Sequence, residues 1–383
     1  MSQKIRDFVP MSCELLAFGE PTHKEPGFAA IRNELFGQLV ESGFRSIALE
    51  TDRVAALTVD EFVRGGEGTL DEVMRTGFSH DFGELAGNRE LVAWLRDHNT
   101  GRPPAEQVGF HGFDGAMETM SAPSPRPYLE YARDYLGLDL DISGPAGSDE
   151  RWNRTEAVLD PEVSPGLTRE AEQLRVLADD MLTALYTRAP ERVAATSPAE
   201  WRRAEINLTT GLGLLRYHRQ AAQPAADEVR WNSLAATRDA LMAQNLLDIR
   251  SVEARRGPTL VHSHNLHLRR SSSIMRMGPL ELVWSGAGAI VAALLGEHYR
   301  VILGSLGRSD GLDLGEPAPG TYESALQNRI GTWSLIASAD VEPGRTRTDI
   351  TREQGYFPLD PDTVADADTI LHLSVGRAPT SVS

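Results

Sequence analysis

Residues 14–50, ELLAFGEPTHKEPGFAAIRNELFGQLVESGFRSIALE, contain the pattern that decides the fold. The apolar run Glu14–Phe18 ends at Gly19 and predicts a buried strand, and Arg45–Glu50 predicts a second strand. Between the two runs, apolar residues recur at the spacing of one helix face, and Gly43 is typical of a helix C-cap. These recurring residues are Phe28, Ile31, Leu35, Leu39 and Val40. Strand, helix and strand in this order form a βαβ unit, which predicts a pair of parallel strands.

Similar segments farther along the chain extend this pattern. Helices are predicted over residues 54–63, 85–98 and 286–295, and strands over residues 107–110, 259–262 and 299–303. Residues 121–165 are rich in Pro, Gly, Ser and Asp and predict a looser region, whereas residues 167–256 have a helical period. The part from Gly304 onward is rich in turn formers, and it is expected to end in a frayed tail.

The sequence therefore predicts an α/β fold with a mixed or mainly parallel sheet flanked by helices. Residues 1–120 and 257–383 are expected to form this α/β core, and residues 121–256 a helical lobe inserted in the core as a cap.

Composition excludes several classes of protein. The chain has 383 residues with 38 Lys and Arg against 55 Asp and Glu, and this net charge of -17 argues against nucleic acid and anionic membranes as partners. No apolar run reaches the ~18 residues of a membrane span, and Met1–Pro10 has no apolar signal region. The single cysteine, Cys13, rules out an internal disulfide and is expected to be buried and inert. We expect a cytoplasmic protein.

Polar residues gather where three predicted strands end. The segments are Glu20–His23, Glu50 and His262–His267. Because the carboxyl ends of strands in an open α/β sheet border one crevice, these side chains are expected to face each other. Histidine transfers protons near neutral pH, and a neighbouring carboxylate fixes its tautomer. Arg32, on the following helix, is suited to binding a carboxylate or an oxyanion.

Each of these residues also has a structural interpretation. Glu20 suits a helix N-terminus, Arg32 suits an exposed helix face, and Glu50 suits an ion pair with Arg53. The catalytic interpretation is favoured only because several such residues share strand ends. The histidines without this context are interpreted as structural or solvent-exposed: His80, His98, His218, His298 and His372.

Common catalytic motifs are absent from the sequence. It has no G-x-S-x-G elbow, which argues against an ordinary α/β-hydrolase, and no phosphate-binding or dinucleotide-binding glycine loop. His262 and His264 would share one face of a strand, and with His23 and Glu50 they form an alternative Zn²⁺ or Mn²⁺ site. Their spacing is not specific for a metal, so the leading hypothesis has no cofactor.

Several segments together resemble the erythromycin esterase family, which includes macrolide-hydrolysing esterases and proteins linked to succinoglycan biosynthesis. They occur in the family's order from Glu14 to about Leu306. The segments are Gly19–His23, Arg32, Gly43-Phe44, Ile47–Glu50, Trp94–Arg96 with Asn99, Gly112–Asp114, Arg238-Asp239, Met242-Ala243 with Asn245, His264-Asn265 with His267, and Met277-Gly278.

This resemblance implies an α/β core with a helical lobe over the site, and ester hydrolysis without a serine nucleophile. His23 matches the family's essential base, which would deprotonate a water molecule. Glu20 and Glu50 match the carboxylates of that site, and Arg32 and His264 match its basic partners. Residues expected to brace the site or contact substrate are His262, His267, Arg238, Asp239 and Asp114.

Departures from the family pattern lie at the site itself. Lys24 replaces the glycine that usually follows the motif histidine, and Ser263 replaces the alanine before His264. The leading hypothesis is a hydrolase acting on an ester or lactone of a hydrophobic natural product, such as a macrolide. The alternatives are a non-hydrolytic or metal-dependent biosynthetic enzyme (a cyclase, dehydratase or epimerase) using the same residues, and a binding protein without turnover.

Overall fold

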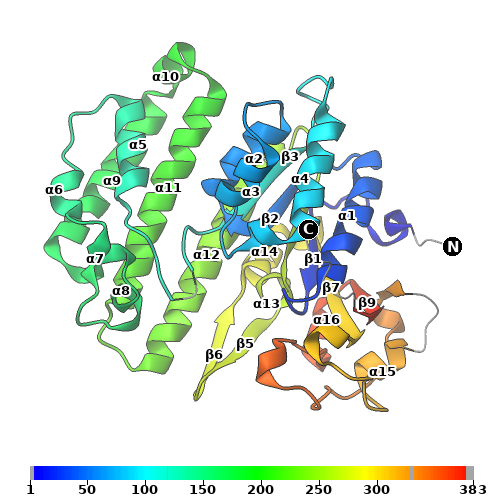
Figure 1. Ribbon diagram of the computed structural model, residues 1–383. Helices are drawn as coiled ribbons and strands as arrows, with labels where there is room; N and C mark the ends of the chain where they lie inside the picture. The colour runs from blue at the N-terminus through cyan, green and yellow to red at the C-terminus, as the bar shows by residue number, and fades with distance from the viewer. Residues whose placement is uncertain (1–3, 119, 328–331, 377–383) are drawn as a thin grey trace.

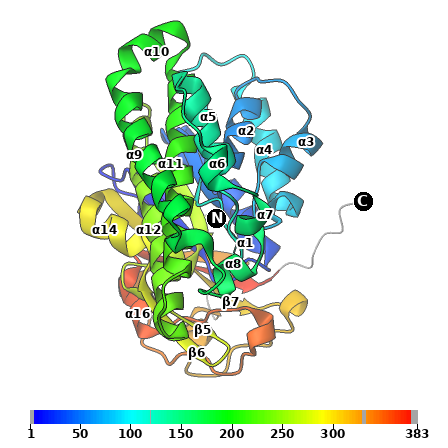
Figure 2. The ribbon, with the colours of Figure 1, turned by 90° about the vertical axis from the view of Figure 1, so that its left-hand side faces the viewer.

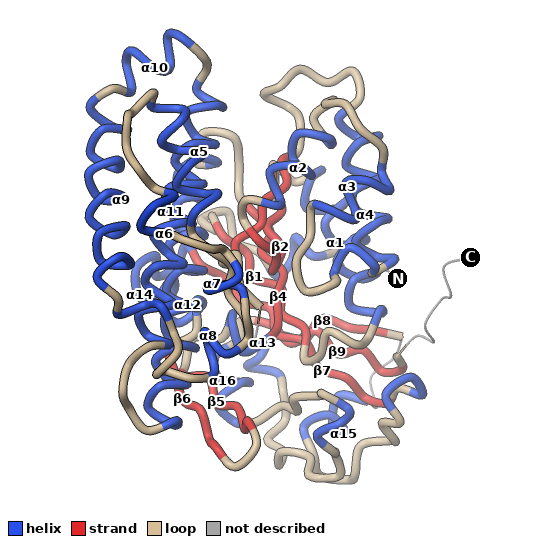
Figure 3. The backbone as a smooth tube through the Cα atoms, turned by 60° about the vertical axis from the view of Figure 1, so that its left-hand side comes forward, coloured by secondary structure: helices blue, strands red, loops and turns tan. Residues whose placement is uncertain are grey.

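A seven-stranded sheet runs through the centre of the computed structural model, which describes residues 4–118, 120–327 and 332–376 (Figures 1 and 3). Its order is β3-β2-β4-β1-β7-β9-β8, and neighbouring strands are parallel except β8, which is antiparallel to β9. The strands are β1 (Leu15–Glu20), β2 (Ser46–Asp52), β3 (Gly109–Asp114), β4 (Thr259–His264), β7 (Tyr299–Arg308), β8 (Trp333–Ala337) and β9 (Thr369–Val375). The predicted mixed, mainly parallel sheet is confirmed.

The position of β4 corrects one expectation. β1 and β2 are parallel but do not pair, because β4 lies between them: Val261 is in register with Ala17 of β1 and Ala48 of β2. The periodicity of residues 14–50 cannot show which distant strand enters the sheet between its two ends. As a consequence, the carboxyl ends of β1, β4 and β2 lie side by side.

Helices cover both faces of the sheet. Leu16 and Phe18 of β1 pack with the helices that follow β1 and β2, and Leu15 and Ala17 pack on the opposite face. β1 is buried at every position, as expected for a central parallel strand. The first face carries α1 (Pro26–Glu41), α2 (Ala55–Val63), α3 (Leu70–Thr76) and α4 (Ala86–Asn99), and the second carries α12 (Asp227–Glu253) and α14 (Ala287–Leu295).

The helical lobe stands to one side of the sheet and has its own core (Figures 1 and 2). It contains α5 (Arg126–Leu136), α6 (Ser143–Ala146), α7 (Glu150–Asn153), α8 (Glu156–Leu159), α9 (Arg169–Thr187), α10 (Ala189–Ala195) and α11 (Pro198–Ala221). The prediction of a loose region over residues 121–165 is therefore wrong at α5, where Leu129, Ala132 and Leu136 form a buried stripe.

α12 connects this lobe to the sheet. Leu234 and Leu241 pack with residues of α11, whereas Met242 and Leu246 pack on the sheet. Because one helix serves both cores, the proposed division into residues 1–120 with 257–383 and residues 121–256 stays a prediction.

The C-terminal part contains more regular structure than its turn formers predict. β8 and β9 extend the sheet, and α15 (Tyr322–Gln327) and α16 (Pro361–Asp366) accompany them. A hairpin of β5 (Ser272–Met277) and β6 (Leu280–Ser285) was also not expected from the sequence. The strand expected at residues 107–110 starts at Gly109 and continues through Asp114. The expected frayed tail falls on residues 377–383, outside the described residues.

Two further expectations concern burial and membranes. Cys13 is 3% exposed, as predicted, and burial raises the pKa of its thiol to about 12. Across residues 4–118, 120–327 and 332–376, the helices lack the combined length and apolarity that crossing a membrane requires.

Candidate active site

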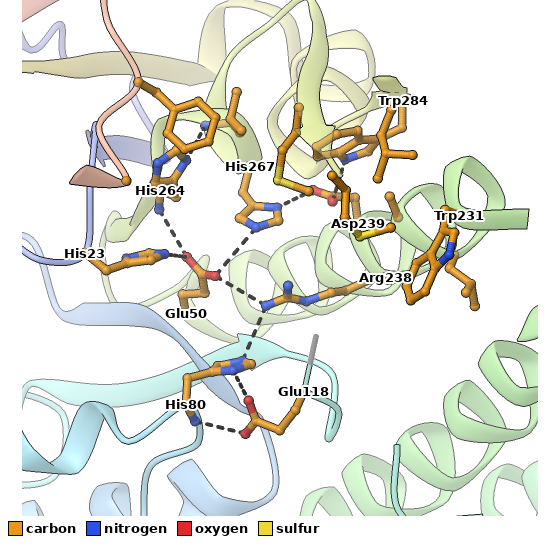
Figure 4. A pocket seen from close by; sticks show the side chains of 18 of the residues that line it. His23, Glu50, His80, Glu118, Trp231, Arg238, Asp239, His264, His267 and Trp284 are labelled. Atoms are coloured by element: carbon orange, nitrogen blue, oxygen red, sulfur yellow. Dashed lines mark hydrogen bonds and ion pairs between the residues drawn. The ribbon is translucent and has the colours of Figure 1, made fainter. Parts of the chain in front are cut away.

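The carboxyl ends of the three adjacent strands β1, β4 and β2 bring the predicted site together (Figure 4). Glu20 at the end of β1 is in register with His264 at the end of β4. The rings of His23 and His264 lie 5.2 Å apart between centroids, and His23 Nε2 lies 3.7 Å from Glu50 Oε2. Glu50 and His264, which are 27 and 241 positions from His23 in the sequence, thus lie beside it, as expected for residues at the ends of parallel strands.

His23 stands on the turn after β1, and a third of its side chain is exposed. Its Nδ1 lies 2.8 Å from Glu20 Oε1, so Nδ1–H donates to the carboxylate and Nε2 is left for chemistry. Burial lowers the pKa of His23, but the charges of Glu50 and Glu20 outweigh this effect and raise the pKa above 6.5. Glu20 does not cap α1, because Glu25 accepts the hydrogen bond from Gly27 N there.

Glu50 is buried and held as a carboxylate by several donors. Its Oε2 accepts from Ser263 Oγ at 2.5 Å and from His264 N at 3.1 Å, and its Oε1 accepts from Arg238 Nη2 at 3.3 Å. Burial opposes ionisation, but neighbouring His23 and the other cations hold the pKa of Glu50 well below 4.5. The structural interpretation of a Glu50–Arg53 pair is wrong, because Arg53 binds an aspartate of α12 instead.

His264 is a neutral hydrogen-bond donor. Its Nδ1 accepts from Leu266 N at 3.2 Å, which leaves the ring proton on Nε2. Within the described part of the chain, this buried Nε2 has no hydrogen-bond partner. Burial lowers the pKa of His264 to about 3, and the nearby charge of His23 adds to that effect. An unpaired buried N–H costs free energy, which a substrate oxygen would recover.

His267 lies on α13 (Asn265–Leu268), directly after β4. Its Nδ1 lies 2.8 Å from Asp239 Oδ1, and its Nε2 lies 3.5 Å from Glu50 Oε1. Asp239 also accepts from Trp284 Nε1 at 2.7 Å. The structure thus joins His267 and Asp239 to the site, opposite His23 (Figure 4).

His80 lies beside the site, which the sequence did not reveal, and its two ion pairs are consistent with the structural interpretation. It lines the cavity, with Nε2 2.9 Å from Asp114 Oδ2 and Nδ1 paired with Glu118. Arg238 binds Asp114 as well, at 2.5 Å, so Asp114 and Arg238 link His80 to Glu50. Burial lowers the pKa of His80, but the two carboxylates raise it to about 9.

No local pattern marks His80, because it follows a helix and a bend rather than a strand. Its backbone has φ 57°, and Asp81 has the same value. Two consecutive non-glycine residues with positive φ, in the left-handed region, are strained. Such backbone strain is often found at functional sites. Only the fold places this segment beside β3.

Arg32 and His262 lie on the far side of Glu20, in a second cavity of about 270 Å³ that also reaches His23 and Glu50. Arg32 is 1% exposed, which excludes the exposed-face interpretation, and it donates to Asn88 Oδ1 at 2.9 Å. His262 Nδ1 donates to Phe18 O at 2.9 Å, and its Nε2 lies 3.5 Å from Glu20 Oε2.

The main cavity has a volume of about 400 Å³, and His23, Glu50, His264 and His267 are among the residues that line it. Residues of α12, Tyr217 of α11, the hairpin and the loop at Phe357 contribute to its walls. That the whole lobe covers the site stays a prediction. The apolar lining consists of Phe82, Tyr217, Trp231, Leu234, Ala235, Leu266, Met275, Met277, Leu282, Trp284 and Phe357. Lys24, the departure from the family pattern, donates to Glu353 O at 2.8 Å and so ties the loop carrying Phe357 to the site.

The alternative metal set was His23, Glu50, His262 and His264. His262 faces Glu20 rather than the other three, and His264 Nδ1 is occupied by a backbone N–H. Among the residues that the structure describes, no three His, Cys, Asp or Glu side chains are grouped in a way that could hold a metal ion.

Three solved structures have a similar fold. A protein from Bacillus cereus is 17% identical with a TM-score of 0.69, over 97% of this chain and 90% of that chain. A histidine-to-asparagine mutant of the erythromycin esterase EreC, in its open conformation, is 17% identical with a TM-score of 0.67, and the match covers 97% of this chain and 93% of that chain. A succinoglycan biosynthesis protein is 14% identical with a TM-score of 0.66, and the match covers 98% of this chain and 92% of that chain.

Comparison with curated proteins gives no match. The family model for erythromycin esterase matches residues 39–379. Glu50, Arg238 and the histidines of β4 and α13 lie inside this segment, whereas Glu20 and His23 precede it. Because the match spans most of the 383 residues, the chain belongs to the erythromycin esterase family.

Proposed function

We propose that this protein hydrolyses an ester or lactone of a hydrophobic small molecule, with His23 as the general base. The observation that carries the proposal is the arrangement of His23: Glu20 holds its Nδ1, and its Nε2 faces Glu50 at the floor of an apolar cavity. Membership in the erythromycin esterase family supports a hydrolase of the esterase type.

The proposed reaction starts from a water molecule beside His23 Nε2. His23 takes a proton from this water, and the water oxygen attacks the acyl carbon of the substrate. Negative charge then develops on the carbonyl oxygen, and the unpaired Nε2–H of His264 is the donor suited to it. Glu50 stabilises the imidazolium that forms on His23. This scheme needs no serine or cysteine nucleophile.

The cavity favours an apolar substrate. Trp231 of α12 and Trp284 of β6 belong to one apolar cluster on the cavity wall, and Met275 and Met277 of β5 add adaptable surface to it. A pocket of this size holds a drug-sized ligand, with a few polar groups to orient it. The similarity to the EreC structure makes macrolides a natural part of the substrate panel.

The direct test is to incubate the purified protein with simple esters, lactones and 14-membered macrolides and to follow product mass. Gain of one water supports hydrolysis. Loss of one water, or a rearranged product of unchanged mass, would indicate the dehydratase, cyclase or epimerase alternative. Binding without any product across the panel would indicate a binding protein and contradict the proposal.

The pH dependence of kcat/KM tests the assignment of His23. A base must be unprotonated, so kcat/KM should rise with pH through the pKa of His23, which lies above 6.5. In Glu20→Gln the amide oxygen still accepts from Nδ1–H, but the negative charge is lost. The pKa of His23 then falls, and the rise in kcat/KM should move to lower pH.

Glu34→Gln, an exposed position on α1, makes the same charge change away from the site and is the matched control. We expect its profile to coincide with that of the wild type. A Glu20→Gln profile that also coincides with the wild type would show that the group titrating on the acid side is not His23.

A further inference from the structure

Two imidazole–carboxylate pairs face each other across Glu50. Glu20 and His23 form the first pair, at 2.8 Å through Nδ1, and His23 Nε2 points at Glu50 Oε2 from 3.7 Å. Asp239 and His267 form the second pair, also at 2.8 Å through Nδ1, and His267 Nε2 points at Glu50 Oε1 from 3.5 Å. Both Nε2 atoms are farther from Glu50 than a normal hydrogen bond, so each has room to bond to a reacting oxygen.

The second pair is held as firmly as a catalytic group requires. Asp239 is 1% exposed, and its Oδ1 also accepts from Ala287 N at 2.7 Å. The backbone of α13 is fixed at both ends: Asn265 Nδ2 donates to Gly304 O at 2.9 Å, and Tyr299 Oη donates to Leu268 O at 2.7 Å. Since a carboxylate only accepts hydrogen bonds, it holds a proton on His267 Nδ1 and leaves Nε2 facing the cavity.

Resting on the proposed hydrolysis, we infer that His267 is the general acid of the reaction and protonates the leaving alcohol. The base alone does not complete ester cleavage, because an alkoxide is a poor leaving group. A proton donor on the opposite side of the acyl carbon from the attacking water removes that barrier. His267 lines the same cavity as His23 and flanks the other oxygen of Glu50 (Figure 4).

The step balances as follows. His23 Nε2 takes a proton from water, and the C–O bond to the water oxygen forms. The bond from the acyl carbon to the leaving oxygen then breaks, and this oxygen takes the proton of His267 Nε2. The products are a carboxylic acid and an alcohol. One proton has passed from water to His23 and one from His267 to the alcohol, so return of a proton from His23 to His267 through solvent restores the site.

Charged groups around His267 favour its protonated form before the reaction begins. Burial opposes the imidazolium, as do Arg238 of α12 and the neighbouring His23 and His264, but Asp239 of α12 and Glu50 of β2 favour it, and the balance raises the pKa of His267 above 6.5. His23 and His267 therefore both titrate above 6.5, and the active form has His23 neutral and His267 charged.

Two esters of one acid test this inference: a p-nitrophenyl ester, whose leaving group needs no proton, and an alkyl ester, whose leaving group does. In His267→Gln, we expect kcat/KM for the alkyl ester to fall by about 10²–10⁴-fold, and that for the p-nitrophenyl ester by less than about 10-fold. For the wild type, kcat/KM for the alkyl ester should also fall at high pH, where His267 loses its proton. This fall should be absent from the pH profile of the p-nitrophenyl ester.

Trp284→Phe is the matched control, because it removes another donor to Asp239 while His267 stays. Any effect of this change should be the same for both esters. An equal loss for both esters in His267→Gln, or no loss for either, overturns the inference while hydrolysis by the wild type still supports the proposed function. No hydrolysis by the wild type of these two esters or of any other ester, lactone or macrolide in the panel overturns both.

Discussion

Replacing His23 by alanine is expected to lower kcat/KM for ester hydrolysis by about 10²–10⁴-fold, the usual contribution of a general base. The carboxylates on both sides cannot replace it. Glu20 points at His23 Nδ1, and the charges around Glu50 hold its pKa so low that it is a weak base at neutral pH. The measurement is the initial rate on whichever ester the wild type hydrolyses.

Chemical rescue separates a lost base from a damaged structure. A third of the His23 side chain is exposed and it lines the cavity, so His23→Ala leaves a space that imidazole from solution can enter. We expect added imidazole to restore part of the rate. His298→Ala, at a histidine 42% exposed and paired with Glu14, is the control and should keep full activity. A His23→Ala protein with nearly full activity would remove His23 from the mechanism.

The second large effect concerns stability. Asp114 is fully buried and binds both Arg238 and His80. In Asp114→Ala both cations lose this partner inside the protein, and removal of one member of a buried ion pair costs about 3–5 kcal/mol. Because Glu50 and Glu118 remain close to the two cations, we expect the lower end of that range, measured as the free energy of unfolding in urea.

The pH dependence of this loss follows from the two titrating groups. Burial opposes ionisation of Asp114, but Arg238 and His80 lower its pKa from 3.8 to about 2, so its stabilisation is complete above about pH 3.8 and is lost as the pH falls towards 2. The pKa of His80 is raised from 6.5 to about 9, so its stabilisation is complete below pH 6.5 and is lost as the pH rises through 9. The difference between wild type and Asp114→Ala should therefore be largest between pH 3.8 and 6.5.

Asp71→Ala is the matched control for Asp114→Ala. It also removes an aspartate that pairs with an arginine, Arg89, but on the surface, where Asp71 is 81% exposed. Solvent screens such a pair, so we expect little change in stability at any pH. Equal losses in the two variants would mean that the buried pairs contribute no more than exposed ones.

Much of this protein could be read from local patterns. In residues 14–50, the spacing of apolar residues is that of strands at both ends and of a helix between them. This spacing shows directly which face of each element is buried. Polar residues at strand ends predicted His23, Glu50 and His264, because the ends of parallel strands share one edge of the sheet. The order of these segments along the chain was also sufficient to predict the family.

The tertiary structure decided which of these residues touch. β4 enters between β1 and β2 and sets His264 opposite Glu20, although 244 positions separate the two in sequence. The fold also brings His80 to Asp114 and Asp239 to His267, and it places Arg32 in a second cavity that meets the main one at His23 and Glu50. Burial and hydrogen bonding then give each histidine its own protonation state, and these depend on neighbours that local periodicity does not report.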